Sequence, residues 1–159
     1  MDSMAKAQVD CTFRQMKEVD LPDVLLNERK GYTHPWAEGI FKDCIRSRYE
    51  CWLILFESQV IGHGILSCMA DEGHMLNICI HPDKQGKGLG RILVEFMLDR
   101  AKARNVRTIF LEVRASNLAA YELYMSLGFN EIGIRKNYYP AFIGREDAIV
   151  LAREILENS

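Results

Sequence analysis

Long apolar runs are missing from this sequence. No stretch approaches the roughly 20 apolar residues that a membrane-spanning helix needs, and residues 1–10 lack the apolar core of a signal peptide. Positive charge is not in excess either, since 20 Lys and Arg against 22 Asp and Glu give a net charge of −2. A chain without surplus positive charge has no general attraction for a nucleic-acid backbone. We therefore expect a soluble, cytoplasmic protein that binds neither a membrane nor nucleic acid directly.

Paired cysteines are also absent. No C-x-x-C spacing occurs among the five cysteines, which are Cys11, Cys44, Cys51, Cys68 and Cys79. This argues against zinc and thioredoxin-type sites, and the mostly apolar neighbours indicate small core residues of a protein in a reducing compartment. A metal site built from His74, His81 and Cys79 is an alternative, but ordinary structural histidines are the more frequent explanation. We expect no metal.

Linkers, repeats and low-complexity tracts are missing as well. The chain of 159 residues, with 48% hydrophobic and 26% charged residues, has the size and composition of one globular domain. We expect a single domain over residues 1–159, in which residues 1–10 need not be ordered.

Hydrophobic periodicity predicts an alternation of strands and helices. Strands are expected at residues 11–16, 51–56, 60–69, 75–80, 108–113, 131–138 and 147–153, and helices at 20–30, 37–46, 88–104 and 118–127. A strand meander comes first and a β-α-β unit over residues 75–113 follows. This order predicts an α/β fold of three layers around a mixed sheet.

The most informative segment is the glycine-rich turn at residues 85–91, between a predicted strand and a predicted helix. Arg91 stands where a Rossmann fingerprint requires glycine, and Gly88 stands where a P-loop requires Ser or Thr. What remains is a tight turn whose backbone N–H groups converge beside a helix N-terminus, with Lys84 and Lys87 nearby. Such a turn suits a pyrophosphate, although a flexible connection to the helix would look the same.

Further motifs join this turn in a fixed order. They are Ile78-Cys79-Ile80, Gln85-x-x-Gly88-x-Gly90, LEVRASN at 111–117, LYxxLGF at 123–129, RKNYYP at 135–140 and GREDA at 144–148. Together they resemble the GNAT superfamily of N-acetyltransferases, and more narrowly the bacterial ribosomal-protein-alanine N-acetyltransferases (the RimI family). The resemblance spans about residues 13–149 and includes Pro35-Trp36.

The resemblance implies a fold and an activity. The fold would be one GNAT domain with a central mixed, mostly antiparallel, twisted sheet that carries helices on both faces. The activity would be transfer of acetyl from acetyl-CoA, the co-substrate, to the N-terminal α-amine of a protein. The acceptor would be the N-terminal alanine of small-subunit ribosomal protein eighteen.

The resemblance also implies residue roles, with Glu112 as general base and Tyr124 as general acid. The coenzyme would be bound by Ile78, Cys79, Ile80, Gly86, Lys87, Gly88, Leu89, Gly90, Arg91 and Asn117, of which the first three contribute main-chain groups to the acetyl-pantetheine arm. Candidates for holding the acceptor peptide are Trp36, Tyr138 and Tyr139.

Each of these roles has a plainer alternative. A period of two separates Glu112 from Leu111 and Val113, and a carboxylate in so apolar a strand needs a partner or a cleft. An ion pair between Glu112 and Arg114 or a loop lysine would meet that need. Tyr124 could be a core tyrosine. The three aromatic candidates for acceptor binding could equally be packed at a sheet edge.

The nature of the acceptor follows from amine basicity. An α-amino group titrates near ~8 and a lysine side chain near ~10.4, so the α-amine is neutral far more often at pH 7. A single carboxylate is therefore better matched to an α-amine. Two alternatives remain: a GNAT enzyme for lysine or a small amine, and a non-catalytic acetyl-CoA-binding module, which would require neither Glu112 nor Tyr124.

Overall fold

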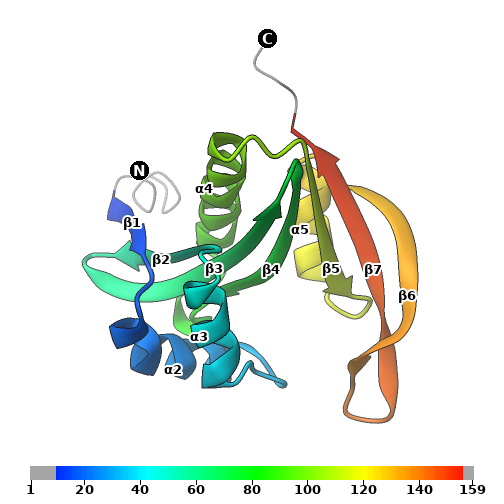
Figure 1. Cartoon of the computed structure of the whole chain (residues 1–159). Helices are drawn as coiled ribbons and strands as arrows, with labels where there is room; N and C mark the ends of the chain where they lie inside the picture. Colours follow the sequence, from blue (N-terminus) through cyan, green and yellow to red (C-terminus); the bar gives the residue numbers. More distant parts are fainter. Residues whose placement is uncertain (1–9, 156–159) are drawn as a thin grey trace. The chain divides into compact units, whose positions relative to one another are not determined.

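The computed structural model describes residues 10–155 and divides into two compact units. One unit consists of the residues up to Ser67 together with Leu76–Arg100, and the other of Cys68–Met75 together with the residues from Ala101 onward (Figure 1). The expectation for residues 1–10 lies outside the described residues except for Asp10.

Over the described residues, the strands hydrogen-bond in the order β1-β2-β3-β4-β5-β7-β6. Their bounds are Cys11–Gln15 (β1), Glu50–Phe56 (β2), Gln59–Met69 (β3), Glu72–Ile80 (β4), Thr108–Arg114 (β5), Asn130–Pro140 (β6) and Arg145–Glu154 (β7). The β1–β2, β2–β3, β5–β7 and β6–β7 ladders are antiparallel, and β4–β5 is parallel. The mixed, mostly antiparallel sheet is confirmed.

The helices are α2 (Leu21–Gly31), α3 (Glu38–Arg46), α4 (Leu89–Ala103) and α5 (Leu118–Ser126), with short 3₁₀ turns at Glu18–Asp20 and Pro82–Lys84. Each lies within two residues of its predicted bounds. In the described chain, none of these helices is both long enough and apolar enough to cross a membrane.

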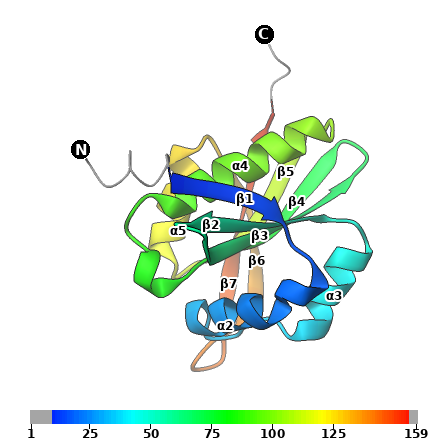
Figure 2. The same ribbon diagram turned by 90° about the vertical axis from the view of Figure 1, so that its left-hand side faces the viewer.

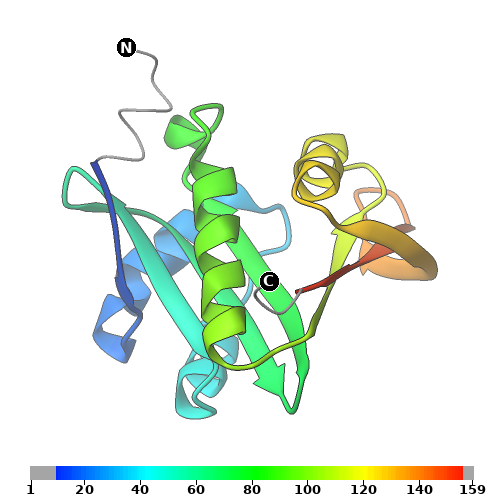
Figure 3. The same cartoon turned by 90° about the horizontal axis from the view of Figure 1, so that it is seen from above.

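The first unit is built on the alternation of side chains along its strands. Cys51 and Leu53 of β2 are buried in a core with residues of α2 and α3, such as Phe41. The neighbour Trp52 points to the opposite face, where it meets Phe96 of α4 edge-on at 4.9 Å between ring centroids. Figures 2 and 3 show α4 on one side of these strands and α2 on the other. The expected helices on both faces are therefore present in this unit.

The second unit places β5 beside the β6–β7 hairpin, with α5 in the same unit (Figure 1). Ile109, Leu111 and Val113 are buried, whereas Phe110 and Glu112 lie half-buried on the other face of β5. The predicted period of two is confirmed, and it keeps the Glu112 side chain out of the hydrophobic core.

One boundary differs in a way that matters for the chemistry. Residues 75–80 were expected to form a strand, but β4 begins at Glu72 because Glu72–His74 pair in parallel with Thr108–Phe110. The added residues are a carboxylate, a glycine and an imidazole, which give no apolar signal. His74 therefore belongs to a strand next to β5.

The prediction that the cysteines are small core residues is confirmed for Cys44, Cys51 and Cys79, which are buried, whereas Cys11 and Cys68 are only partly buried. None of the five, all within the described residues, forms a disulfide. Burial raises the pKa of Cys51 and of Cys79 to about 12, so both remain protonated thiols. They are small core residues and not nucleophiles.

Candidate active site

The glycine-rich turn of the first unit joins the end of β4 to the start of α4. Gly86 and Gly88 have φ values of +77° and +78°, in the left-handed region that glycine adopts without strain. Ile92 N–H donates to Gly88 O at 3.2 Å, which closes the first turn of the helix. The first N–H groups of a helix lack acceptors within the helix and point toward its N-terminal end, where an anion can bind.

The side chains around this turn differ in what they can contribute. Lys87 is exposed, whereas Leu89 is buried and can offer only its backbone N–H. Arg91 makes an ion pair at 3.4 Å with Glu95, one helical turn further along α4. A phosphate group at the turn would therefore meet backbone N–H groups, Lys87 and an arginine that a nearby glutamate already orients.

The end of β4 carries the main-chain groups assigned to the acetyl-pantetheine arm. The Tyr32 hydroxyl donates to the Ile78 carbonyl, and the Gln85 side-chain amide donates to the Ile80 carbonyl at 3.1 Å. Each carbonyl oxygen has a second lone pair, with which it can still accept a hydrogen bond from a coenzyme. Over the described residues, the β4–β5 ladder pairs Glu72–His74 with Thr108–Phe110, and Ile78–Ile80 lie beyond it along β4.

We expect Gly88→Val to weaken acetyl-CoA binding by at least tenfold, because a β-branched residue disfavours φ near +78° and fills the space that a phosphate would approach. Gly133→Val is the matched control, since Gly133 has open space around its Cβ position and no positive φ. Calorimetric titration with acetyl-CoA measures both affinities. Unchanged affinity in a folded Gly88 variant would contradict the assignment of this turn.

In the second unit, Glu112 is the chemically distinctive residue. Its side chain is 7% exposed, and its Oε2 lies 2.7 Å from Nε2 of His74. Among the described residues, Oε1 accepts only a long contact of 3.4 Å, from the Tyr138 hydroxyl. The two carboxylate oxygens are thus unequal: one is held firmly and the other is nearly free.

The charge state of Glu112 results from opposing effects. Burial raises the pKa of Glu112, but the hydrogen bond and charge of His74, the charge of Arg135 and the Tyr138 hydroxyl together hold it below its ordinary value. The carboxylate is therefore ionised at neutral pH and able to accept a proton.

Arg114, expected as one alternative partner of Glu112, does not pair with it, so this part of the prediction is wrong. Arg114 makes its ion pair with Glu146 at 2.9 Å and also donates to the Pro140 carbonyl at 2.7 Å. Glu146 in turn accepts from Ser116. Arg114 organises the β6–β7 end of the unit, and the partner of Glu112 is His74, which the sequence did not single out for this role.

An irregularity in β6 brings Tyr138 to Glu112. The β6–β7 register shifts between Arg135 and Tyr139, and Asn137 has a φ of +52° within the shift. A bulge of this kind re-aims side chains that strict alternation would send to opposite faces. Tyr138 consequently reaches Glu112, while Tyr139 lies under the Arg114 guanidinium at 4.5 Å. Burial, aided by the Glu112 charge, raises the pKa of Tyr139 to about 12.

Tyr124 lies on α5 and is buried, with its ring edge-on to Phe129 at 5.5 Å. Burial, reinforced by the neighbouring Tyr139, raises the pKa of Tyr124 far above that of a free phenol. Tyr139 is thus an electrostatic neighbour of both Glu112 and Tyr124. Tyr124 keeps its proton at every working pH, as a proton donor must.

Asn117 serves as the N-cap of α5. Its Oδ1 accepts from Ala120 N–H at 3.2 Å, a typical capping interaction. The oxygen is therefore used by the fold, and the side-chain NH₂ is the group with which Asn117 could bind the coenzyme.

Trp36, in the first unit, is held from two sides. Its backbone N–H donates to Glu28 Oε2 at 3.0 Å, and its ring packs against Phe41 at 5.2 Å between centroids. The indole is partly buried against the core of α2, α3 and β2. Packing therefore accounts for much of its surface, and its role toward an acceptor stays a prediction.

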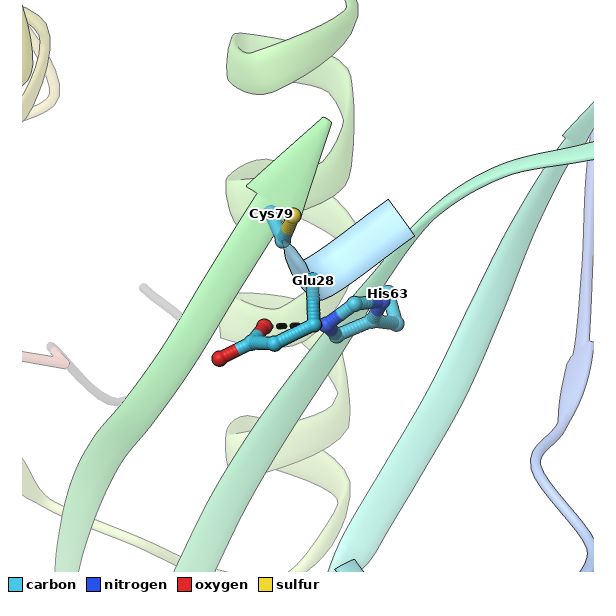
Figure 4. A group of neighbouring side chains, drawn as sticks. All are labelled: Glu28, His63 and Cys79. Carbon is cyan, nitrogen blue, oxygen red and sulfur yellow. Dashed lines mark hydrogen bonds and ion pairs between the residues drawn. The ribbon is translucent and has the colours of Figure 1, made fainter. Parts of the chain in front are cut away.

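Glu28 belongs to a buried polar cluster that sequence reasoning missed. Its carboxylate accepts from His63 Nε2 at 2.9 Å and from the Asn77 side-chain amide at 3.1 Å and 3.2 Å, besides the Trp36 backbone. Figure 4 shows the Glu28 carboxylate directed at the His63 ring, with Cys79 on the neighbouring strand. The cluster ties α2 to β3 and β4, because a buried carboxylate requires several donors.

Among the described residues, Glu28, His63 and Cys79 are the group whose ligand atoms, all within 4.8 Å of one another, could hold a metal ion. His74 and His81 are not part of it, so the expected alternative site is not formed. Glu28 would have to give up hydrogen bonds that satisfy it, and Cys79 a proton that burial holds firmly. These residues are better explained as structural, and the expectation of a metal-free protein stays a prediction.

Comparison with known proteins agrees with this geometry. The model of the acetyltransferase (GNAT) family matches residues 13–129. The [ribosomal protein bS18]-alanine N-acetyltransferase of Escherichia coli K12 is 42% identical over 144 residues, which cover 91% of this chain and 97% of that protein. Its counterpart in Haemophilus influenzae is 38% identical over 89% of this chain and 92% of its own length.

A solved structure matches as well. The crystal structure of the ribosomal-protein-S18-alanine N-acetyltransferase from Escherichia coli superposes with a TM-score of 0.88 at 40% identity, covering 94% of this chain and 96% of that one. The sequence resemblance and the fold are thereby confirmed, and the chain belongs to the acetyltransferase (GNAT) family.

Proposed function

We propose that the protein transfers acetyl from acetyl-CoA to the N-terminal α-amine of a protein, with the N-terminal alanine of small-subunit ribosomal protein S18 as its acceptor. The observation that carries the proposal is Glu112, an ionised, largely buried carboxylate with one oxygen held by His74 and the other making only a long contact among the described residues. Relatives named as enzymes for this reaction, at 42% and 38% identity over most of the chain, support the choice of acceptor.

The chemistry follows from the two residues of the second unit. The neutral amine attacks the thioester carbonyl carbon, so that a C–N bond forms and the C–S bond breaks. Glu112 accepts the proton that leaves the nitrogen, directly or through a water. The Tyr124 hydroxyl donates a proton to the departing thiolate, whose conjugate thiol has a pKa near ~8.5. Solvent then restores both residues to their starting states.

Coenzyme binding falls to residues of the first unit and to Asn117. The turn at Gly86–Arg91 would receive the pyrophosphate on its backbone N–H groups, with Lys87 and Arg91 adding positive charge. The backbone of Ile78, Cys79 and Ile80 would receive the acetyl-pantetheine arm. We assign no metal to the reaction. We place it in the cytoplasm, where its acceptor is synthesised, with no direct contact to nucleic acid or membrane.

Acceptor mapping tests the proposal. We expect a peptide that begins with alanine and carries internal lysines to be acetylated at its α-amine, because that amine is the weaker base by ~2.4 pKa units. Tandem mass spectrometry after incubation with acetyl-CoA locates the label. The same peptide with a blocked N-terminus is the control and should gain no label. Label mainly on lysine would establish the lysine alternative, and coenzyme binding without any transfer would establish the binding module.

A further inference from the structure

The contact between His74 and Glu112 is the shortest side-chain contact that the described structure gives either residue. His74 lies on β4 level with Phe110 of β5, and Glu112 follows two residues later on the same face of β5. The pair is therefore set diagonally across two parallel strands. Pairing of Glu112 with Val150 of β7 holds the backbone of the carboxylate, and pairing of His74 with Phe110 holds that of the imidazole.

The two oxygens of the Glu112 carboxylate make different contacts, and this gives them different roles. His74 Nε2 lies 2.7 Å from Oε2, a distance typical of a charge-assisted hydrogen bond, and it must carry a hydrogen to donate to an ionised carboxylate. Oε1 receives only the 3.4 Å contact from Tyr138. The oxygen with one weak donor is the more basic of the two, because the short bond from His74 stabilises the negative charge on Oε2.

The two residues also differ in exposure. The Glu112 side chain is 7% exposed and that of His74 is 38% exposed. His74 can therefore exchange protons with solvent, and an imidazole is the side chain whose charge changes most readily between pH 5 and 8. A charge that appears 2.7 Å from Glu112 stabilises its ionised form and makes it a weaker base.

We propose that His74 is a positioning residue for Glu112: its Nε2–H holds Oε2 of the carboxylate, leaves Oε1 to take the proton of the acceptor amine, and sets the basicity of that carboxylate through its own charge. The inference rests on the proposed function, since it assumes Glu112 as the base. The other charged or titratable groups that bear on Glu112 are Arg135, Tyr138 and Tyr139, all from β6. Among these side-chain types and His74, the imidazole is the type whose charge ordinarily changes between pH 5 and 8.

Two substitutions of His74, which differ by one methylene, test whether the position of the donor beside Glu112 matters. His74→Gln places an N–H donor near the position of Nε2, the atom that contacts Glu112, but carries no charge. His74→Asn places its donor near the position of Nδ1 and does not reach Oε2. Glutamine should preserve kcat above pH 8, whereas asparagine should lower it about 10- to 100-fold, as expected when a reacting group is misplaced by an ångström. KM for acetyl-CoA should change in neither.

The pH profile tests the role of charge. The rate of His74→Gln is divided by the wild-type rate at each pH. Protonation of the acceptor amine affects both enzymes equally and cancels in this ratio. This ratio should rise as pH falls from 8 to 6, by up to about tenfold, because an imidazole ordinarily gains a charge in this range and glutamine does not, and such a charge beside Glu112 weakens the base. A flat ratio together with equal kcat values for the two variants would overturn the proposal.

An NMR titration of Glu112 requires no turnover, so it tests the role of His74 separately from the proposed function. The Glu112 carboxyl carbon, identified by its absence from the NMR spectrum of Glu112→Gln, reports the titration of this residue directly. The pKa of Glu112 should rise in His74→Gln and rise further in His74→Asn, since the first loses the charge and the second also loses the hydrogen bond. An unchanged titration in both would overturn the inference. If the wild-type protein acetylates no α-amine peptide, the proposed function fails while this titration still decides whether His74 controls Glu112.

Discussion

Glu112→Gln should lower kcat by about 10²- to 10⁴-fold, the range that general base catalysis typically supplies. Glutamine keeps the size of the side chain and can still accept from His74 Nε2–H through its carbonyl oxygen. What it cannot do is take a proton from the amine. The loss should fall on kcat, with acetyl-CoA affinity nearly unchanged, because Glu112 is assigned to neither the pyrophosphate nor the pantetheine. Steady-state kinetics with an alanine-initiated peptide and calorimetry with acetyl-CoA measure the two quantities.

The pH dependence of this variant carries separate information. In the wild type, the lowered pKa of Glu112 keeps the carboxylate ionised as pH falls through the range in which a free glutamate begins to protonate. Protonation of Glu112 should therefore not limit the wild-type rate over the pH range in which the amine titrates. The Gln variant depends on amine that is already neutral, so its residual rate should rise with pH up to the amine pKa near ~8.

Glu122→Gln, on the exposed surface of α5, is the matched control and should leave kcat unchanged. One result would remove Glu112 from the mechanism. If Glu112→Gln lowers the melting temperature but leaves turnover per folded molecule near wild type, the charge of Glu112 serves the fold and not the reaction.

Features that depend on local periodicity could be predicted from the sequence. The alternation in β5 separated Glu112 from Leu111 and Val113, and helical spacing placed α4 directly after the glycine-rich turn. The positive φ values of Gly86 and Gly88 agree with a tight turn in which glycine is needed. These features are short-range, because each follows from residues only a few positions apart.

Features that depend on strand pairing could not be predicted in this way. His74 is 38 residues from Glu112 in sequence, and only the parallel register of β4 and β5 brings them together. The register shift in β6 that turns Tyr138 toward Glu112 has no signal in the hydrophobic pattern either. A histidine in a polar stretch looks like a loop residue until its pairing partner is known.

The buried Glu28 cluster escaped prediction for a related reason. Glu28 stands in a helix whose other charged residues face solvent, so its burial follows from packing against β3 and β4 and not from its neighbours in sequence. Charged residues are almost never fully buried unless they are paired, and pairing partners 35 and 49 positions away cannot be read from a periodic pattern.

Tyr124→Phe should also lower kcat by about 10²- to 10⁴-fold with acetyl-CoA, because it removes one oxygen, the proposed proton donor to the thiolate. Phenylalanine fits the same buried space and keeps the edge-on contact with Phe129, so the fold should be retained. Tyr121→Phe, three residues earlier on α5, removes a hydroxyl that bonds Glu131 at the surface and should leave kcat unchanged.

Thioesters with different leaving groups show whether Tyr124 acts as a proton donor or only as a core residue. A thiol more acidic than that of coenzyme A departs as a thiolate without help, so an acetyl thioester of such a thiol should be used by Tyr124→Phe with a much smaller loss of rate. Parallel kinetics of wild type and variant on the two thioesters give this ratio. Because burial keeps the Tyr124 phenol protonated at every working pH, the loss should not vary with pH. An equal loss on both thioesters would mean that Tyr124 supports the active site by packing alone, and the thiolate would then take its proton from solvent.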